Sequence, residues 1–134
     1  MKIRTGTDIV AVSRIEKILK NRKDSFLLKC FTDQEREYAE SFSSPKRQAE
    51  IYSARFAAKE AAAKALGTGL CIDGITFLDF EVSRDPNGAP GICFHGRAEE
   101  IARGLRIISA SLSLSHENEY AVAVCTLLTD EKDS

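Results

Sequence analysis

RFAAKEAAAKALGTG, residues 55–69, is an alanine-rich stretch in which Glu60 is the only acid. Alanine, glutamate and lysine are strong helix formers and Gly67 is a natural helix stop, so the stretch predicts the second half of a helix. Upstream, Ser44-Pro45 offers an N-cap and a first helical residue, which extends the prediction to one long helix over 44–67. The small side chains around Glu60 would let another backbone, or a ligand, approach closely.

Two earlier helices are marked by capping boxes, in which a Ser or Thr is followed three residues later by Glu. The pair Ser13 and Glu16 predicts a helix whose N-cap is Ser13. The pair Thr32 and Glu35 predicts a second helix, over 32–42.

An alternating pattern of apolar and polar residues predicts strands at residues 3–12, 75–82, 91–96, 107–116 and 120–128. Asn87-Gly88 is the strongest signal for a turn between the second and third of them. One face of the second and fourth strands should carry Thr76, Leu78, Phe80 and Val82, and Ile108, Ala110, Leu112 and Leu114. Helices first and antiparallel hairpins later predict an α+β protein, with N-terminal helices, one of them long, packed on antiparallel hairpins.

The chain has 134 residues, 43% of them hydrophobic, so we expect a single domain over residues 1–134 with a modest core. Its net charge of −1 argues against a general binder of nucleic acid. The charge is uneven, because residues 1–29 contain eight Lys or Arg and three Asp or Glu. This basic segment predicts a local acidic partner or a phosphate.

The four cysteines, Cys30, Cys71, Cys93 and Cys125, form no CxxC motif and no Cys/His cluster, which argues against a zinc site. We expect them to be buried, reduced thiols, as in a cytoplasmic protein. The first ten residues hold no apolar signal core, and no stretch approaches membrane-spanning length. The sequence therefore predicts a cytoplasmic protein without membrane contact.

Two acids, Asp8 and Glu60, are candidates for a metal site. Asp8 lies in an apolar strand, where a carboxylate is costly unless it is paired or coordinated. Two carboxylates from separate elements suit Mg²⁺, which fills its other positions with water and phosphate oxygens. Arg55, Lys59 and Lys64 could then hold the rest of a phosphate chain. The alternatives are an Asp8 that faces water or pairs with an arginine, and a Glu60–Lys64 pair on a solvated helix face.

Three motifs in this order and spacing resemble the 4′-phosphopantetheinyl transferase superfamily, in its small, holo-[acyl-carrier-protein] synthase branch. They are GTDIV at 6–10, RFAAKEAAAKALGTG at 55–69, and SLSH followed by YAVAV at 113–124. The sequence DPNGAP at 85–90 falls where the family has its turn. The resemblance therefore covers nearly the whole chain.

The resemblance implies a reaction that moves 4′-phosphopantetheine from coenzyme A to a serine of apo-acyl carrier protein. The other product would be adenosine 3′,5′-bisphosphate, and the reaction would support fatty acid biosynthesis. It implies that Asp8 and Glu60 bind Mg²⁺ and that Lys64 offsets charge on the pyrophosphate. Glu60 is also the family's candidate for the base that takes the serine proton.

The remaining contacts with coenzyme A follow from the same resemblance. Arg55 and His116 would meet the 3′-phosphate, Asn87 and Gly88 would lie near the adenine, and Arg47 would reach the nucleotide phosphates. Family members of this size look like homotrimers with active sites at the subunit interfaces, so we expect a homotrimer here.

The acidic acyl carrier protein is the expected partner of the basic N-terminal segment. In the family the helix after the first motif docks on the carrier, and Arg14 matches that position. Lys17 and Lys20 are further candidates from their charge alone. One departure concerns Arg4, which stands where many members have a second glycine and adds a bulky cation near the start of the strand.

Two other functions remain open. A binding module that grips an acidic protein or RNA through its basic helix would tolerate the loss of Asp8. A hydrolase of coenzyme A or of a nucleotide would release phosphopantetheine to water and would need no carrier. Dependence on Mg²⁺ and on a carrier separates these functions from the transferase.

Overall fold

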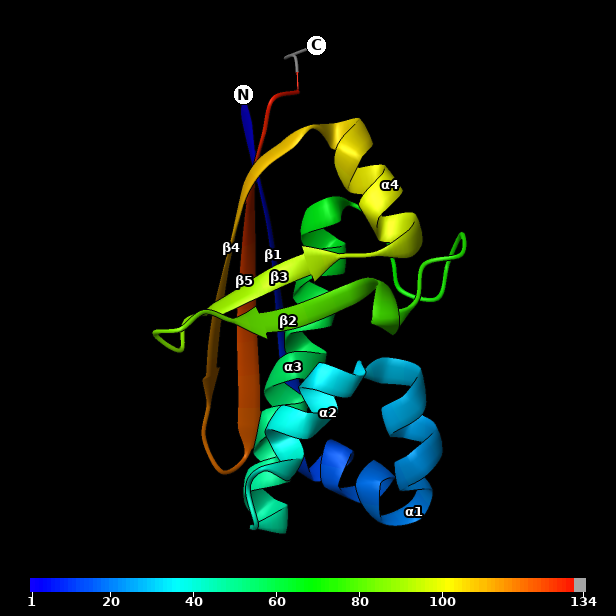
Figure 1. Ribbon diagram of the computed structural model, residues 1–134, viewed down its shortest axis with the longest axis vertical. Coiled ribbons are helices and arrows are strands. Elements are labelled where there is room, and N and C mark those ends of the chain that lie inside the picture. The colour runs from blue at the N-terminus through cyan, green and yellow to red at the C-terminus, as the bar shows by residue number, and fades with distance from the viewer. Residues whose placement is uncertain (132–134) are drawn as a thin grey trace.

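The computed structural model describes residues 1–131, which form four helices, a short 3₁₀ helix and five strands (Figure 1). The elements in chain order are β1 (Lys2–Ala11), α1 (Val12–Cys30), α2 (Asp33–Glu40), α3 (Pro45–Leu66), η1 (Phe77–Asp79), β2 (Phe80–Arg84), β3 (Pro90–Phe94), α4 (Gly96–Leu105), β4 (Ile107–His116) and β5 (Tyr120–Thr129). The α+β prediction is confirmed. The final residues of the predicted domain, 132–134, lie outside the described residues.

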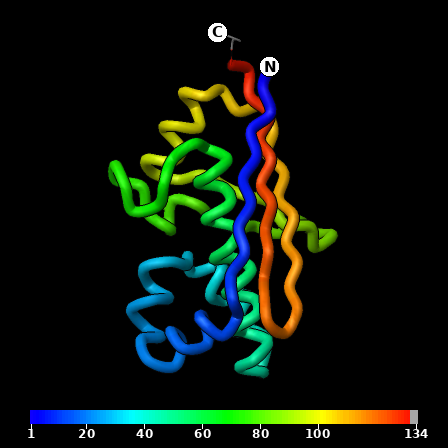
Figure 2. The backbone as a smooth tube through the Cα atoms, turned by 180° about the vertical axis from the view of Figure 1, so that it is seen from behind, coloured from blue at the N-terminus to red at the C-terminus, as the bar shows by residue number. Residues whose placement is uncertain are grey.

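The strands form two antiparallel sheets that pack around α3. The larger sheet has the order β1-β5-β4, and β2 and β3 make a separate hairpin. The long strands run side by side in front of the helices in Figure 2, whereas the hairpin crosses α3 on the other side in Figure 1. The central helix is therefore enclosed between the sheet and the layer made by α1, α2 and the hairpin.

The predicted limits of α3 are confirmed. The Ser44 hydroxyl accepts a hydrogen bond from the Arg47 amide, and Pro45 occupies the first turn. Gly67 ends the helix with φ +84°, a left-handed conformation that glycine adopts without strain. Nearly every side chain between Ala49 and Leu66 is buried, since α3 is covered on several sides.

The strand β1 lies directly on the backbone of α3 at Gly6. A Cβ at this position would lie 2.1 Å from the carbonyl oxygen of Ala61 and 2.6 Å from the amide nitrogen of Ala65. Only glycine lets the strand lie on the helix backbone here, and the alanines on the facing side of α3 make the same approach possible. This contact brings Asp8, two residues further along β1, beside the helix.

The departure at Arg4 has a structural explanation. The Arg4 guanidinium donates to the carbonyl oxygens of Ala65 (2.9 Å) and Leu66 (3.1 Å), which have no partner within the helix. It also lies 3.4 Å from Glu131. Arg4 therefore caps the C-terminus of α3 and fastens it to β1, instead of disturbing the strand.

Three details of the sequence prediction are wrong. Helix α1 starts at Val12 with Ala11 as its N-cap and no side-chain cap bond, so Ser13 lies inside the helix and does not form the expected capping box with Glu16. The strand expected from residue 75 starts at Phe80, because residues 77–79 form a 3₁₀ turn that exposes Leu78. Ile108 is 53% exposed, because an irregularity in the β4–β5 pairing takes it off the face it was expected to share.

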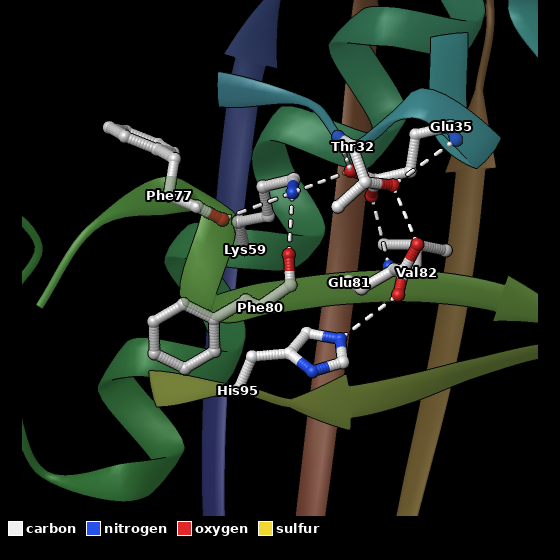
Figure 3. A network of polar contacts seen from close by, with 8 residues as sticks. All are labelled: Thr32, Glu35, Lys59, Phe77, Phe80, Glu81, Val82 and His95. Carbon is white, nitrogen blue, oxygen red and sulfur yellow. Dashed lines mark hydrogen bonds and ion pairs between the residues drawn. The ribbon is translucent and has the colours of Figure 1, made fainter. Parts of the chain in front are cut away.

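A buried polar network joins α2, α3 and the hairpin (Figure 3). The Lys59 ammonium is fully buried and donates to Glu35 at 2.8 Å and to the carbonyls of Phe77 and Phe80. The other Glu35 oxygen accepts from the Val82 amide, while the capping box expected between Thr32 and Glu35 is present.

This network overturns the prediction that Lys59 holds substrate phosphate, because all of its contacts are internal. Burial lowers its pKa, while Glu35 raises it by charge and by the hydrogen bond. The Thr32 hydroxyl donates to Glu81 at 2.6 Å, and Glu81 lies 2.9 Å from His95, so the network continues to the surface.

Only half of the expected buried thiols are buried. Cys30 and Cys125 are enclosed, and burial raises the pKa of each thiol to about 11. Cys71 and Cys93 are exposed. Among residues 1–131, no helix is long and apolar enough to cross a membrane.

The Gly6 contact predicts a large effect of a single methyl group. Gly6→Ala should lower the free energy of unfolding by about 2 kcal/mol or more, because its Cβ overlaps helix backbone that cannot move aside. Gly104→Ala is the matched control, since nothing lies within 4 Å of its Cβ and the change in α4 should stabilise by about 0.5–1 kcal/mol. Urea denaturation of both variants tests the prediction, and equal stability of Gly6→Ala and wild type would contradict it.

Candidate active site

The strand β1 and the last turns of α3 bring the predicted catalytic residues together. The Lys64 ammonium lies 3.2 Å from Asp8 and donates to the carbonyl of Thr7 at 3.0 Å. Lys64 therefore pairs across to β1, which differs from the simple Glu60–Lys64 helix pair considered from the sequence. The Asp8 side chain is 20% exposed, so the cluster reaches the surface.

The electrostatics of Glu60 indicate an acidic pair. Burial raises the pKa of the Glu60 carboxyl, and the nearby negative charge of Asp8 raises it further. Lys64 and Arg14 lower it in turn, so the charges of all three groups act on Glu60. Two neighbouring carboxylates are suitable oxygen donors for a hard divalent cation such as Mg²⁺.

The residues present fit a magnesium site of the open kind. Among residues 1–131, no group of three or more His, Cys, Asp or Glu side chains could hold a metal ion. Mg²⁺ needs no such cage, because it commonly takes one or two carboxylates and leaves its other positions to water and phosphate. Asp8 and Glu60 supply the two carboxylates that such a site requires.

Arg14 enters this cluster from α1, and the two neighbouring lysines do not. The Arg14 guanidinium lies 5.4 Å from the centre of the Phe56 ring on α3, and its charge lowers the pKa of Glu60. Lys17 and Lys20 instead line a groove of about 570 Å³ between α1 and the start of α3. The three predicted carrier-binding residues thus point to two different surfaces.

A second cluster surrounds Tyr38 on α2. The guanidinium carbon of Arg55 lies 4.5 Å from the centre of the Tyr38 ring, and that of Arg84 lies 4.6 Å from it. Arg55 is only 4% exposed, and burial lowers its pKa. The sequence analysis selected Arg55 and missed Tyr38 and Arg84, because no spacing rule links α2 to the end of β2.

The turn between β2 and β3 lies beside this second cluster. Asp85 accepts hydrogen bonds from the amides of Asn87 and Ala89, and Gly88 adopts φ +87°. A Cβ on Gly88 would lie 3.1 Å from the Arg84 guanidinium. The structure therefore brings the residues predicted near the adenine, Asn87 and Gly88, close to the arginines.

The other two predicted ligands of coenzyme A lie elsewhere in the chain. His116, at the end of β4, lies 3.6 Å from Glu50 on α3, and its buried Nδ1 has no hydrogen-bond partner among residues 1–131. Arg47, in the first turn of α3, lies over the ring of Phe42. His116 belongs to the sheet, whereas Arg55 faces α2, so the two residues expected at one phosphate do not meet within one chain.

Comparison with known proteins adds an independent line of evidence. Residues 4–125 match the 4′-phosphopantetheinyl transferase superfamily. The chain is 46% identical over 123 residues to a holo-[acyl-carrier-protein] synthase from Koribacter versatilis, covering 92% of this chain and 95% of that protein.

Solved structures of such enzymes share the fold. The holo-(acyl-carrier-protein) synthase of Bacillus anthracis, determined in complex with CoA (3′,5′-ADP), is 37% identical with a TM-score of 0.75, over 92% of this chain and 94% of that one. The Plasmodium yoelii holo-ACP synthase has a TM-score of 0.82 at 29% identity, over 98% of this chain and all of that one. This chain belongs to the holo-[acyl-carrier-protein] synthases of the 4′-phosphopantetheinyl transferase superfamily.

Proposed function

We propose that the protein transfers 4′-phosphopantetheine from coenzyme A to a serine of an apo-acyl carrier protein, in the cytoplasm and in support of fatty acid biosynthesis. The observation that carries the proposal is the cluster of Asp8, Glu60 and Lys64, in which two carboxylates and a lysine from β1 and α3 reach the surface together. Relatives named for this reaction, one of them solved with CoA, support it.

In the proposed mechanism, the carrier serine attacks the β-phosphorus of coenzyme A and adenosine 3′,5′-bisphosphate leaves. Asp8 and Glu60 would hold Mg²⁺, which when bound supplies positive charge to the pyrophosphate. Lys64 neutralises charge on the leaving phosphate, since phosphoryl transfer depends mainly on positioning and electrostatic stabilisation. Glu60 accepts the serine proton, directly or through a water molecule.

The transfer is tested by the intact mass of an acidic apo-acyl carrier protein incubated with the enzyme, coenzyme A and Mg²⁺. We expect the mass of one phosphopantetheine to be added, and the addition to stop in EDTA. Glu60→Gln and Asp8→Asn should each slow it by about a hundred-fold or more, while circular dichroism stays unchanged. Addition that persists in EDTA and in both variants would contradict the proposal, and phosphopantetheine released without a carrier would indicate a hydrolase.

We further propose that the carrier binds to α1 through Arg14, Lys17 and Lys20. The charge of Arg14 acts on Glu60, so an acidic helix bound at Arg14 would bring its serine toward the catalytic cluster. Lys17 and Lys20 line the neighbouring groove, where charge attraction mainly speeds association. Because Arg14 lies on a different surface from Lys17 and Lys20, we expect their substitution to affect carrier binding differently.

Arg14→Glu should raise the KM for the carrier by about ten-fold or more, because it also reverses the charge beside Glu60. The double change Lys17→Glu and Lys20→Glu should raise KM less and should weaken its dependence on salt. The KM for coenzyme A should change in neither variant. Steady-state kinetics at low and high salt measure these effects, and an unchanged carrier KM in both variants would exclude α1 as the docking surface.

We also propose a homotrimer whose active sites lie between subunits. The outer face of the sheet, which the helices leave uncovered in Figure 2, carries exposed apolar side chains: Ile3, Ile9, Tyr120, Val122 and Val124. Several exposed apolar side chains gathered on one face are typical of an interface. The separation of His116 from Arg55 within one chain supports the same arrangement, because His116 of the partner subunit could complete the phosphate site.

Val124→Lys should convert the trimer to a monomer, since it places a charge on the apolar sheet face. Leu28→Lys, at a 60% exposed position on α1, is the control and should leave the oligomer intact. Light scattering after size-exclusion chromatography measures both masses. A wild-type protein that elutes as a monomer at micromolar concentration would contradict the trimer.

A further inference from the structure

The carboxylate of Glu35 joins three separate elements of the fold (Figure 3). One of its oxygens accepts hydrogen bonds from the Lys59 ammonium on α3 and from the Thr32 amide at the cap of α2, each at 2.8 Å. The other oxygen accepts from the Val82 amide on β2 at 2.9 Å. The Glu35 side chain is fully buried, so bulk solvent does not compete for these bonds. Glu35 therefore fixes α2, β2 and α3 to one another.

The three groups that bind the Glu35 oxygens are all donors, which makes this carboxylate hard to replace. A glutamine amide presents an oxygen on one side and an NH₂ group on the other. Whichever way that amide is turned, its NH₂ group meets a donor, either Lys59 with the Thr32 amide or the Val82 amide. Glutamine would also leave the buried Lys59 ammonium without its acid. Only a carboxylate satisfies all three donors at once.

The same three elements carry the cluster of Tyr38, Arg55 and Arg84, which we call the Tyr38 cluster. Tyr38 lies one helical turn beyond Glu35 itself. Arg55 lies one turn before the bound lysine, and Arg84 lies two residues beyond the bound amide. Both guanidinium carbons are close to the tyrosine ring, at 4.5 and 4.6 Å from its centre. A shift of α2 or β2 against α3 would therefore take this cluster apart.

The catalytic cluster of Asp8, Glu60 and Lys64 is held by a different contact. It is built on β1 and α3, and β1 lies on the helix backbone at Gly6. The bonds of the Glu35 carboxylate run to α2, α3 and β2 instead. Loss of this carboxylate should therefore loosen the Tyr38 cluster and leave the catalytic cluster in place.

We propose that Glu35 is a positioning residue for coenzyme A, an inference that rests on the proposed function for the identity of the ligand. Its buried carboxylate holds the Tyr38 cluster in the arrangement that binds the substrate, without touching the substrate itself. A role in folding alone would lower the melting temperature and leave the KM of the folded molecules unchanged. A positioning role raises the KM for coenzyme A and leaves kcat unchanged, because binding of substrate and transition state weakens equally.

Steady-state kinetics of the folded enzyme distinguish these two roles. Glu35→Gln should raise the KM for coenzyme A by about ten-fold or more, because small displacements of binding groups are costly. Its kcat and its KM for the carrier should stay within about two-fold of the wild type. Glu37→Gln, the same change at an exposed acid of α2, is the matched control and should alter none of these values. An unchanged KM for coenzyme A in Glu35→Gln would overturn the proposal.

A double variant separates positioning from stability. Glu35→Leu with Lys59→Met removes both buried charges, and apolar groups often replace a buried ion pair without loss of stability. It should melt closer to the wild type than Glu35→Gln does. Its KM for coenzyme A should still be raised by about ten-fold or more, because the bond to the Val82 amide stays lost. Recovery of both stability and KM, or failure of both variants to fold, would assign Glu35 to folding and overturn the proposal.

Titration calorimetry with coenzyme A, in the absence of a carrier, separates the role of Glu35 from the proposed function. Glu35→Gln should bind coenzyme A about ten-fold or more weakly than the wild type, and Glu37→Gln should match the wild type. Weakened binding in a protein whose wild type transfers nothing would keep the role of Glu35 and contradict the transferase. Normal transfer with an unchanged affinity for coenzyme A in Glu35→Gln would keep the transferase and overturn the role of Glu35.

Discussion

The contact between Gly6 and the backbone of α3 is the constraint on which the catalytic cluster depends. Alternate residues of a strand share a face, so Gly6 and Asp8 both face the helix. On α3, Glu60 and Lys64 are one turn apart, beside the alanines that Gly6 touches. A side chain at residue 6 would separate the two elements and move Asp8 away from Lys64. Position 6 therefore requires glycine, because glycine has no Cβ.

Successive residues of α3 serve opposite sides of the molecule. A helix turns by about 100° per residue, so neighbouring side chains point in different directions. Lys59 points toward α2 and the hairpin, where its bonds to Glu35, Phe77 and Phe80 fasten both to the helix (Figure 3). The next residue, Glu60, is instead influenced by the charge of Asp8 on β1. The same helix thus supports the hairpin turn and the acidic pair and fixes their distance from one another.

The sequence was sufficient for features that depend on local chemistry. The Ser44 cap, the Pro45 start, the Gly67 stop and the Asn87-Gly88 turn all follow from backbone preferences of single residues, and all are present. The acidic pair could also be expected, because an acid within an apolar strand needs a partner.

Features that depend on tertiary contacts could not be read from the sequence. Lys59 and Lys64 are the same residue type on the same helix, yet one is fully buried and the other is exposed. Their difference arises from which elements cover each side of α3. The exposure of Ile108 likewise depends on an irregularity in strand pairing, and the Arg55–Tyr38–Arg84 cluster joins three separate elements.

Arg4 shows how the start of β1 accommodates a large cation beside a helix that elsewhere excludes even a Cβ. Arg4 and Gly6 are two residues apart, so both face α3. Opposite Gly6 the helix backbone is continuous and leaves no space, whereas opposite Arg4 the helix has reached its last residues and exposes unpaired carbonyl groups. The guanidinium binds the carbonyls of Ala65 and Leu66 and lies against Gly67, where a Cβ would be 2.4 Å from it. The point at which α3 ends therefore determines which of the two strand positions must be glycine.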